Sequence, residues 1–257
     1  KHREATPYRW VIEGALLPLH VANGLNLFAP APLFPLIRDD YHLSRGTVSL
    51  TMVLVFLVFT IFLIPGGVIV AKLGTKKAIA LSGFSMAAGV FAVATPNFAA
   101  LLPLRAAFGM GGSIFIPATS TVIVQWFKPS ERPMMNALNI ASQGTGVAMA
   151  MILSVPLADA FEWRTVLTIY GVFTLLGTLT WLLLGRSSPT DAAPIKMLPL
   201  VAVLHVLKER NTLLLSLALL GPFAMFTGYS SWLPTYYNEV FGMSLQRATS
   251  LLAILPL

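Results

Sequence analysis

The chain has 257 residues, of which 56% are hydrophobic and 11% are charged, and its formal net charge is +7. Soluble domains carry about a quarter charged residues, so this composition excludes a water-soluble globular domain. Apolar runs of roughly 20 residues recur along the chain, and that length crosses a bilayer as a helix. The basic residues lie in short segments between these runs, which indicates membrane topology rather than nucleic-acid binding.

The ends of the sequence and its cysteine content carry further information. No cysteine is present, so disulfides and thiolate chemistry are excluded. The first apolar run is too long for the core of a signal peptide and ends without a small-residue cleavage site. The sequence begins without Met and stops at Leu257 inside an apolar run. We therefore expect it to be a fragment of a longer chain.

Seven complete spans and the start of an eighth are predicted, in an all-α membrane protein. The spans are expected at 10–37, 48–70, 78–95, 98–127, 134–157, 166–184 and 212–237, with an eighth beginning near 245. The segment at 186–211 is more polar and contains Pro189, Pro194 and Pro199. We expect an N-terminal six-helix bundle over 1–185, a cytoplasmic connector over 186–211, and the start of a C-terminal bundle over 212–257.

The distribution of basic residues predicts the orientation of the chain. Cytoplasmic loops of membrane proteins are enriched in lysine and arginine. With a cytoplasmic N-terminus, twelve of the 17 basic residues fall on the inner side, and the outer side holds Arg38, Arg45, Arg105, Arg164 and Arg247. We predict a multi-pass protein of the cell (inner or plasma) membrane, with a cytoplasmic N-terminus, that contacts the lipid bilayer and binds no nucleic acid.

The segment GGVIVAKLGTKK at 66–77 lies between the second and third predicted spans. Gly67 and Gly74 are expected to let two membrane helices approach closely and turn. Lys72, Lys76 and Lys77 would hold this hairpin on the cytoplasmic side. We expect these five residues to form a gating loop.

The spacing within this hairpin resembles the loop between helices two and three of the major facilitator superfamily, G-x-L-A-D-R-x-G-R-K. Gly67, Lys72, Gly74 and Lys76 match that pattern. Ala71 occupies its acidic position, and Thr75 occupies a basic one.

Other segments resemble the same family in the same order. RAAFGMGG at 105–112 resembles its R-x-x-x-G-x-G pattern, and the segments at 126–146 and 162–164 resemble its later loops. SSWLPTYYNEVFGMS at 230–244 is similar to helix seven of organic-anion and cyanate-type members. The resemblance implies a six-plus-six helical bundle, of which this chain holds the first half, the connector and the first one to two spans of the second half.

Polar side chains inside the predicted spans are the candidate functional residues. A charge at the centre of a bilayer costs about 2.5–3.5 kcal/mol on insertion scales. At 3.6 residues per turn, Arg105 shares a helix face with Gly109, Gly112, Ile116 and Thr119. The predicted substrate or coupling cavity is formed by Glu13, His20, Asn23, Arg105, Asn139, Gln143, Thr227 and Ser231.

Several of these residues have alternative structural interpretations. Asn139 and Gln143 either line the cavity or form hydrogen bonds between helices. Arg105 either binds an anion in the cavity, or reaches the outer interface, or pairs with an acid such as Asp159. His20 either carries a proton or binds substrate, or is a neutral histidine satisfied by a neighbouring helix. Glu13 either lines the cavity or pairs with Arg9. The family resemblance implies a proton-coupling role for Arg105.

The sequence contains no H-E-x-x-H, G-x-S-x-G, P-loop or Cys/His cluster, each of which marks a catalytic or metal site. We therefore expect no enzyme, no metal and no cofactor. The expected function is secondary active transport by alternating access, as a monomer, with a small polar or anionic solute and protons as partners in a symporter. Arg105 favours an anion.

Transport has three alternatives. The main alternative is a membrane receptor or adaptor that is built on a transporter-like bundle and translocates nothing. An intramembrane enzyme would need a nucleophile–base pair, and the sequence shows none. A channel would need a continuous polar pore, which the apolar second and third spans oppose.

Overall fold

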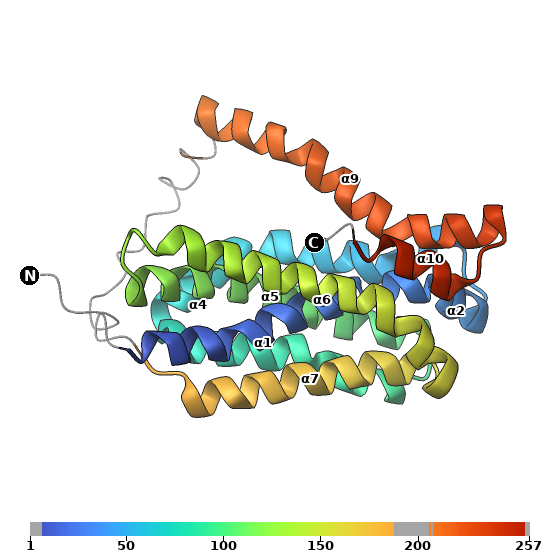
Figure 1. The fold of residues 1–257 in the computed structure, drawn as a ribbon, viewed down its shortest axis with the longest axis horizontal. Coiled ribbons are helices and arrows are strands. Elements are labelled where there is room, and N and C mark those ends of the chain that lie inside the picture. Colours follow the sequence, from blue (N-terminus) through green and yellow to red (C-terminus); the bar gives the residue numbers. More distant parts are fainter. Residues whose placement is uncertain (1–6, 188–205, 207, 255–257) are drawn as a thin grey trace, which may run out of the picture.

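The computed structural model describes residues 7–187, 206 and 208–254, and within these residues it contains helices and no strand (Figure 1). This confirms the predicted all-α membrane fold. The elements are α1 (Arg9–Phe28), α2 (Pro30–Tyr41), α3 (Arg45–Val48), α4 (Leu50–Met86), the 3-10 helix η1 (Ala87–Ala94), α5 (Phe98–Trp126), α6 (Arg132–Phe161), α7 (Trp163–Leu184), α9 (Arg210–Phe241) and α10 (Leu245–Leu252). Most of the predicted connector at 186–211 lies outside the described residues.

Six helical stretches in the described part are long and apolar enough to cross a membrane. They are Arg9–Tyr41, Arg45–Ala94, Phe98–Trp126, Arg132–Phe161, Trp163–Leu184 and Arg210–Phe241. The second stretch has 50 residues and contains both the second and the third predicted spans. Each of the other predicted spans matches one stretch, to within a few residues at each end. Helix α10 begins at Leu245, where the eighth span was expected.

The predicted hairpin is present as a reversal within α4. Gly74 has φ 75° and ψ 162°, a conformation that is essentially restricted to glycine. The arm before Gly74 contacts α5 at Gly109 through Val55, and the arm after it contacts Gly111 through Ser82. The two arms therefore pack side by side against one helix, so the 50-residue stretch crosses twice.

The close approach expected at Gly67 is made by its neighbour instead. A Cβ added at Gly66 would collide with the backbone carbonyl of Ser113 on α5, whereas a Cβ at Gly67 would meet nothing within 4 Å in the described structure. The expectation for Gly67 is therefore wrong by one residue. A shift of one residue rotates a helical position by about 100°, which turns Gly67 away from α5.

Helices α1 and α6 are in direct backbone contact. A Cβ at Gly24 would overlap the carbonyl oxygen of Gln143, and a Cβ at Gly146 would overlap that of Val21. Small residues permit this approach, which maximises van der Waals contact where lipid provides no hydrophobic driving force. This contact sets Gln143 on α6 beside the middle of α1.

The bundle has two ends, which we name by residues. At the Tyr8 end, the Tyr8 hydroxyl donates to the Leu184 carbonyl at 2.6 Å, and its ring lies 6.3 Å from that of Trp126. Trp181 donates to the Lys76 carbonyl at 3.0 Å, so the reversal of α4 lies at this end too. At the Arg38 end, α2 meets the second half of α9.

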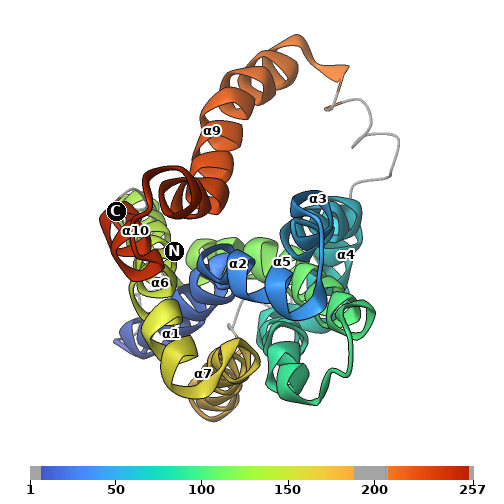
Figure 2. The same cartoon turned by 90° about the vertical axis from the view of Figure 1, so that its right-hand side faces the viewer.

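Helix α9 touches the rest of the molecule along only part of its length (Figures 1 and 2). Its first turns carry exposed leucines, such as Leu217 at 68%. Further along α9, the ring of Phe223 lies 5.9 Å from that of Phe56. Such contacts continue to Trp232, which lies 5.1 Å from Phe34.

Candidate functional site

A cavity of about 320 Å³ lies among α1, α4, α5, α6 and α9. This volume is typical of sites for small molecules. Its polar side chains in the described part are Asn23 from α1, Thr60 from α4 and Gln143 from α6. The structure thus brings Asn23 and Gln143, two of the predicted site residues, to one cavity.

The rest of the cavity wall is apolar and rich in aromatic rings. Phe56 and Phe59 come from α4, Phe108 from α5 and Phe223 from α9. These rings were not predicted as site residues. The signal was present in the sequence, because Phe56, Phe59 and Thr60 are three and four residues apart and so share one helix face.

Glycines on α5 keep the floor of this cavity open. Gly109 and Gly112 line it, as does Ile116, so three members of the predicted α5 face lie there. A Cβ added at Gly112 would lie 3.4 Å from the ring of Phe59 and 4.0 Å from Oδ1 of Asn23. The phenyl ring and the amide therefore border the same space.

Arg105 lies beside this cavity and not on its wall. Its side chain is buried, at 6% exposure, and borders a second, smaller pocket. It donates from Nε to the Thr51 carbonyl at 2.8 Å, from Nη1 to the Asn26 carbonyl at 2.9 Å, and from Nη2 to the Leu27 carbonyl at 3.1 Å. Asp159 is exposed, so neither structural alternative considered for Arg105 is observed.

The partners of Arg105 follow from the proline that begins α2. In a continuous helix the carbonyl of Asn26 would accept a hydrogen bond from the nitrogen of residue 30. Residue 30 is Pro30, which has no N–H. Arg105 supplies a donor to the freed carbonyl and so braces the junction of α1 and α2 against the start of α4.

Glu13 and His20 are buried in α1, at 2% and 4% exposure. Neither has a hydrogen-bond partner for its side-chain polar atoms among the described residues. The alternative that Glu13 pairs with Arg9 is wrong, because Arg9 instead forms an ion pair at 3.0 Å with Glu131, the residue that precedes α6. The His20 ring lies 4.7 Å from the ring of Phe115.

The remaining predicted residues lie away from the cavity wall. Asn139 is buried at 5% exposure on α6, and its amide has no partner in the described part. Ser231 donates to the Thr227 carbonyl at 2.6 Å and contacts the Met52 sulfur at 3.4 Å. Thr227 and Ser231 thus lie where α9 meets α4, and the cavity does not include them.

The predicted gating loop lies at the Tyr8 end. Lys72 and Lys77 are exposed and Lys76 is half-buried. Thr75, which replaces a basic residue of the family pattern, is buried and donates to Gln125 of α5 at 3.4 Å. The hairpin is therefore fixed to α5 through Thr75, while Lys72 and Lys77 remain exposed.

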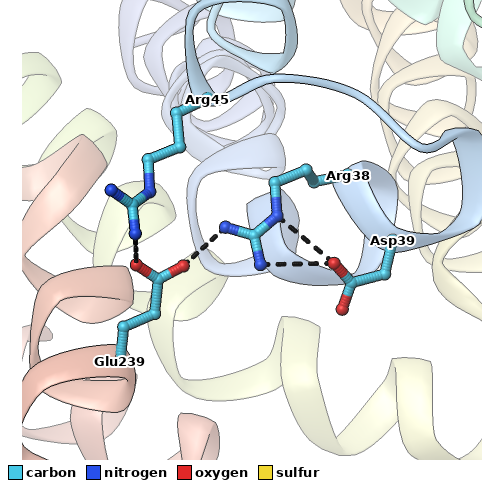
Figure 3. Close-up of polar contacts among 4 residues, drawn as sticks. All are labelled: Arg38, Asp39, Arg45 and Glu239. Atoms are coloured by element: carbon cyan, nitrogen blue, oxygen red, sulfur yellow. Dashed lines mark hydrogen bonds and ion pairs between the residues drawn. The ribbon is translucent and has the colours of Figure 1, made fainter.

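An ion-pair cluster at the Arg38 end was not predicted (Figure 3). Glu239 of α9 accepts from Arg38 of α2 at 2.5 Å and also from Arg45 of α3. Asp39 binds Arg38 from the other side at 3.2 Å. Glu239 is about 200 positions away from both arginines, so no local sequence pattern indicates the pairing.

Comparison with known proteins identifies relatives of the chain. A hexuronate transporter of Bacillus subtilis is 24% identical, over 92% of this chain and 58% of the relative. The chloroplastic ascorbate transporter of Arabidopsis thaliana is 27% identical, over 97% and 49%. The chain thus spans about half the length of these relatives.

Solved structures show the same fold. A crystal structure of a bacterial homolog to the human lysosomal transporter Spinster, inward-facing and unoccupied, matches with a TM-score of 0.75 at 20% identity, over 98% of this chain and 60% of that one. The family model described as Major Facilitator Superfamily matches residues 16–257. The chain therefore belongs to the Major Facilitator Superfamily.

Proposed function

We propose that this protein is a secondary active transporter that moves a small polar or anionic solute by alternating access, with protons as the coupling ion. The observation that supports this most is the cavity of about 320 Å³. It lies between helices of the first bundle and α9, and Asn23 and Gln143 supply amide donors and acceptors to it. A solute held there would lie between two groups of helices.

Alternating access is supported by the way α9 contacts the first bundle. Aromatic contacts and the Glu239 ion pairs hold the two together at the Arg38 end, while the first turns of α9 are exposed. Two bodies joined at one end can rock about the site between them. We propose that the loop with Gly67, Lys72, Gly74, Lys76 and Lys77 closes the Tyr8 end in the opposite state.

Proton coupling is assigned to α1. Glu13 and His20 are seven residues apart, two helical turns, and so share a face. Ionisable groups inside membrane helices mark proton and substrate pathways. Arg9, one turn before Glu13 on α1, is paired with Glu131. The Glu13 carboxyl has no partner among the described residues, and we propose that it exchanges a proton.

The anionic character of the solute is supported by the relatives, which include a hexuronate and an ascorbate transporter. Arg105 places a positive charge behind Leu27, which lines the cavity. Because three of its five N–H groups bind backbone carbonyls, we propose that Arg105 positions α1 and adds a favourable field for an anion.

The test is uptake into proteoliposomes that contain the natural full-length protein, with and without an inward proton gradient. The solutes are glucuronate, ascorbate, acetate and inorganic phosphate. Uptake of at least one anion should rise with the gradient and fall when a protonophore is added. The variants Glu13→Gln and His20→Asn should lower this dependence on protons.

A matched pair of glutamine variants tests the cavity itself. Gln143→Leu should reduce uptake at low solute concentration by about tenfold, because a buried polar contact to the solute is lost. Gln246→Leu, which changes an exposed residue of α10, should leave uptake unchanged. Uptake of no solute by the wild type, or equal effects of both variants, would contradict the proposal.

A further inference from the structure

We infer that the cavity selects a small cyclic solute, one that stacks a flat apolar face on Phe59 while its polar edge binds Asn23 and Gln143. This inference rests on the proposed function and specifies its solute class. The cavity would select solutes by shape as well as by charge, because it would bind a ring more tightly than an open chain of equal charge.

The composition of the cavity wall is the first support. Four phenylalanines line the cavity, and the polar side chains from the described residues are two amides and one hydroxyl. No charged side chain of the described part borders it. A compact, fully hydrated ion would gain little from such a wall, since its hydration shell would be replaced by apolar surface.

The placement of these groups is the second support. The position of a Cβ on Gly112 is 3.4 Å from the Phe59 ring and 4.0 Å from the Asn23 amide oxygen. An aromatic surface and a hydrogen-bonding group therefore border one small volume from two sides. A flat ring with a polar edge fits this arrangement, because one face contacts the phenyl ring and the edge meets the amides.

Phe59 is the residue best suited to this role. It is half-buried, so one part of its ring is free toward the cavity. Phe108 is 3% exposed, and the Arg105 guanidinium lies 5.2 Å from the centre of its ring. The guanidinium therefore covers a face of this ring. Phe223 belongs to α9 and is 56% exposed. Phe56 packs edge-on against Phe223, with the ring centroids 5.9 Å apart. The specificity contact is therefore assigned to Phe59.

The test measures binding separately from transport. Ligand-induced shifts in the thermal unfolding of the purified full-length protein give dissociation constants for two pairs of equal charge and equal carbon number, glucuronate against gluconate and benzoate against heptanoate. The first member of each pair is cyclic. It should bind about five- to tenfold more tightly than the open-chain member, the range expected for an aromatic contact.

Phe59→Leu should remove most of this preference, and Phe62→Leu is its matched control. Phe62 lies three residues further on the same helix, is 38% exposed and does not line the cavity. Gly112→Ala is a second variant, because its methyl group would enter the space between Phe59 and Asn23. It should weaken binding of the cyclic solutes, while Gly221→Ala, where a Cβ would meet nothing within 4 Å in the described structure, should not.

Equal affinities within both pairs, or a preference that survives Phe59→Leu, would overturn the inference while anion uptake would still support the proposed transport. A Phe59-dependent preference without any uptake would support the inference and contradict transport. If no member of either pair binds, the inference is overturned.

Discussion

The two ends of the bundle are held by different kinds of contact. At the Tyr8 end, the helices are tied to one another by backbone carbonyls and aromatic rings, as in the bonds of Tyr8 to Leu184 and of Trp181 to Lys76. At the Arg38 end, charged side chains of α2 and α3 bind Glu239 of α9. Contacts within one body resist separation, whereas contacts between two bodies can break and re-form. Under the proposed alternating access, the contacts that must break are those at the Arg38 end.

The largest expected effect comes from Arg105→Ala, which removes the brace between α1, α2 and α4. Three carbonyls lose a charged donor. The carbonyl of Asn26 cannot accept a helical hydrogen bond instead, because the residue four positions later is Pro30, which has no N–H. The free energy of unfolding should fall by about 2–4 kcal/mol. Thermal unfolding in detergent measures this loss.

Two further variants serve as controls for Arg105→Ala. Arg105→Lys should recover part of the stability, because an ammonium replaces the fork with a single donor group. Arg247→Ala, at an exposed arginine of α10, should change stability little. An Arg105→Ala protein as stable as the Arg247→Ala protein would contradict the bracing role.

Gly74→Ala should have the next largest effect, at the Tyr8 end. The φ of 75° and ψ of 162° are strained for any residue with a Cβ, which costs about 1–3 kcal/mol. Thermal unfolding again provides the measurement. Gly67→Ala is the control, and because Gly67 is helical with open space around it, alanine there should be neutral or stabilising. Equal stability of the two variants would refute the strained turn.

Glu239→Gln should open the Arg38 end without unfolding the protein. It weakens two charge-assisted bonds, and exposed ion pairs are worth about 0.2–1 kcal/mol each, so the open population should rise roughly fivefold. Since the chain has no cysteine, a single Ser231→Cys reports this change. Ser231 is 6% exposed, and its labelling by an impermeant thiol reagent should accelerate.

The matched control for Glu239→Gln is Glu162→Gln. Glu162 is an exposed acid between α6 and α7 and forms none of the ion pairs found in the described part. Its substitution should leave the labelling rate of Ser231→Cys unchanged. A Glu239→Gln rate equal to that of the control would show that the cluster does not hold this end closed.

The smallest effect is expected from Ala71→Asp at the Tyr8 end. This substitution restores the acidic position of the family pattern beside the lysines of the hairpin. It should strengthen closure of the Tyr8 end and shift the population toward the state open at the Arg38 end, by about twofold. Labelling of Ser231→Cys should rise slightly, and no rise would count against a gating role for the hairpin.

The helices could be located from the sequence pattern alone. Apolar runs of the length of a bilayer predicted α5, α6, α7 and α9 within a few residues, because lipid requires each span to satisfy its own backbone hydrogen bonds. Gly74 was predictable as a turn, since its position between two such runs forces a reversal. The family was recognisable from short motifs whose order is fixed by the same topology.

Only the tertiary structure decided how side chains meet. Arg105 was singled out from its position in a span, but its partners depend on Pro30, which lies 75 residues earlier in a different helix. Gly66 and Gly67 are indistinguishable by composition, and the rotation of α4 against α5 selected Gly66. Glu239 and Arg38 are separated by 201 residues. Helical periodicity defines a face but not the neighbour it meets, because packing between distant helices sets that choice.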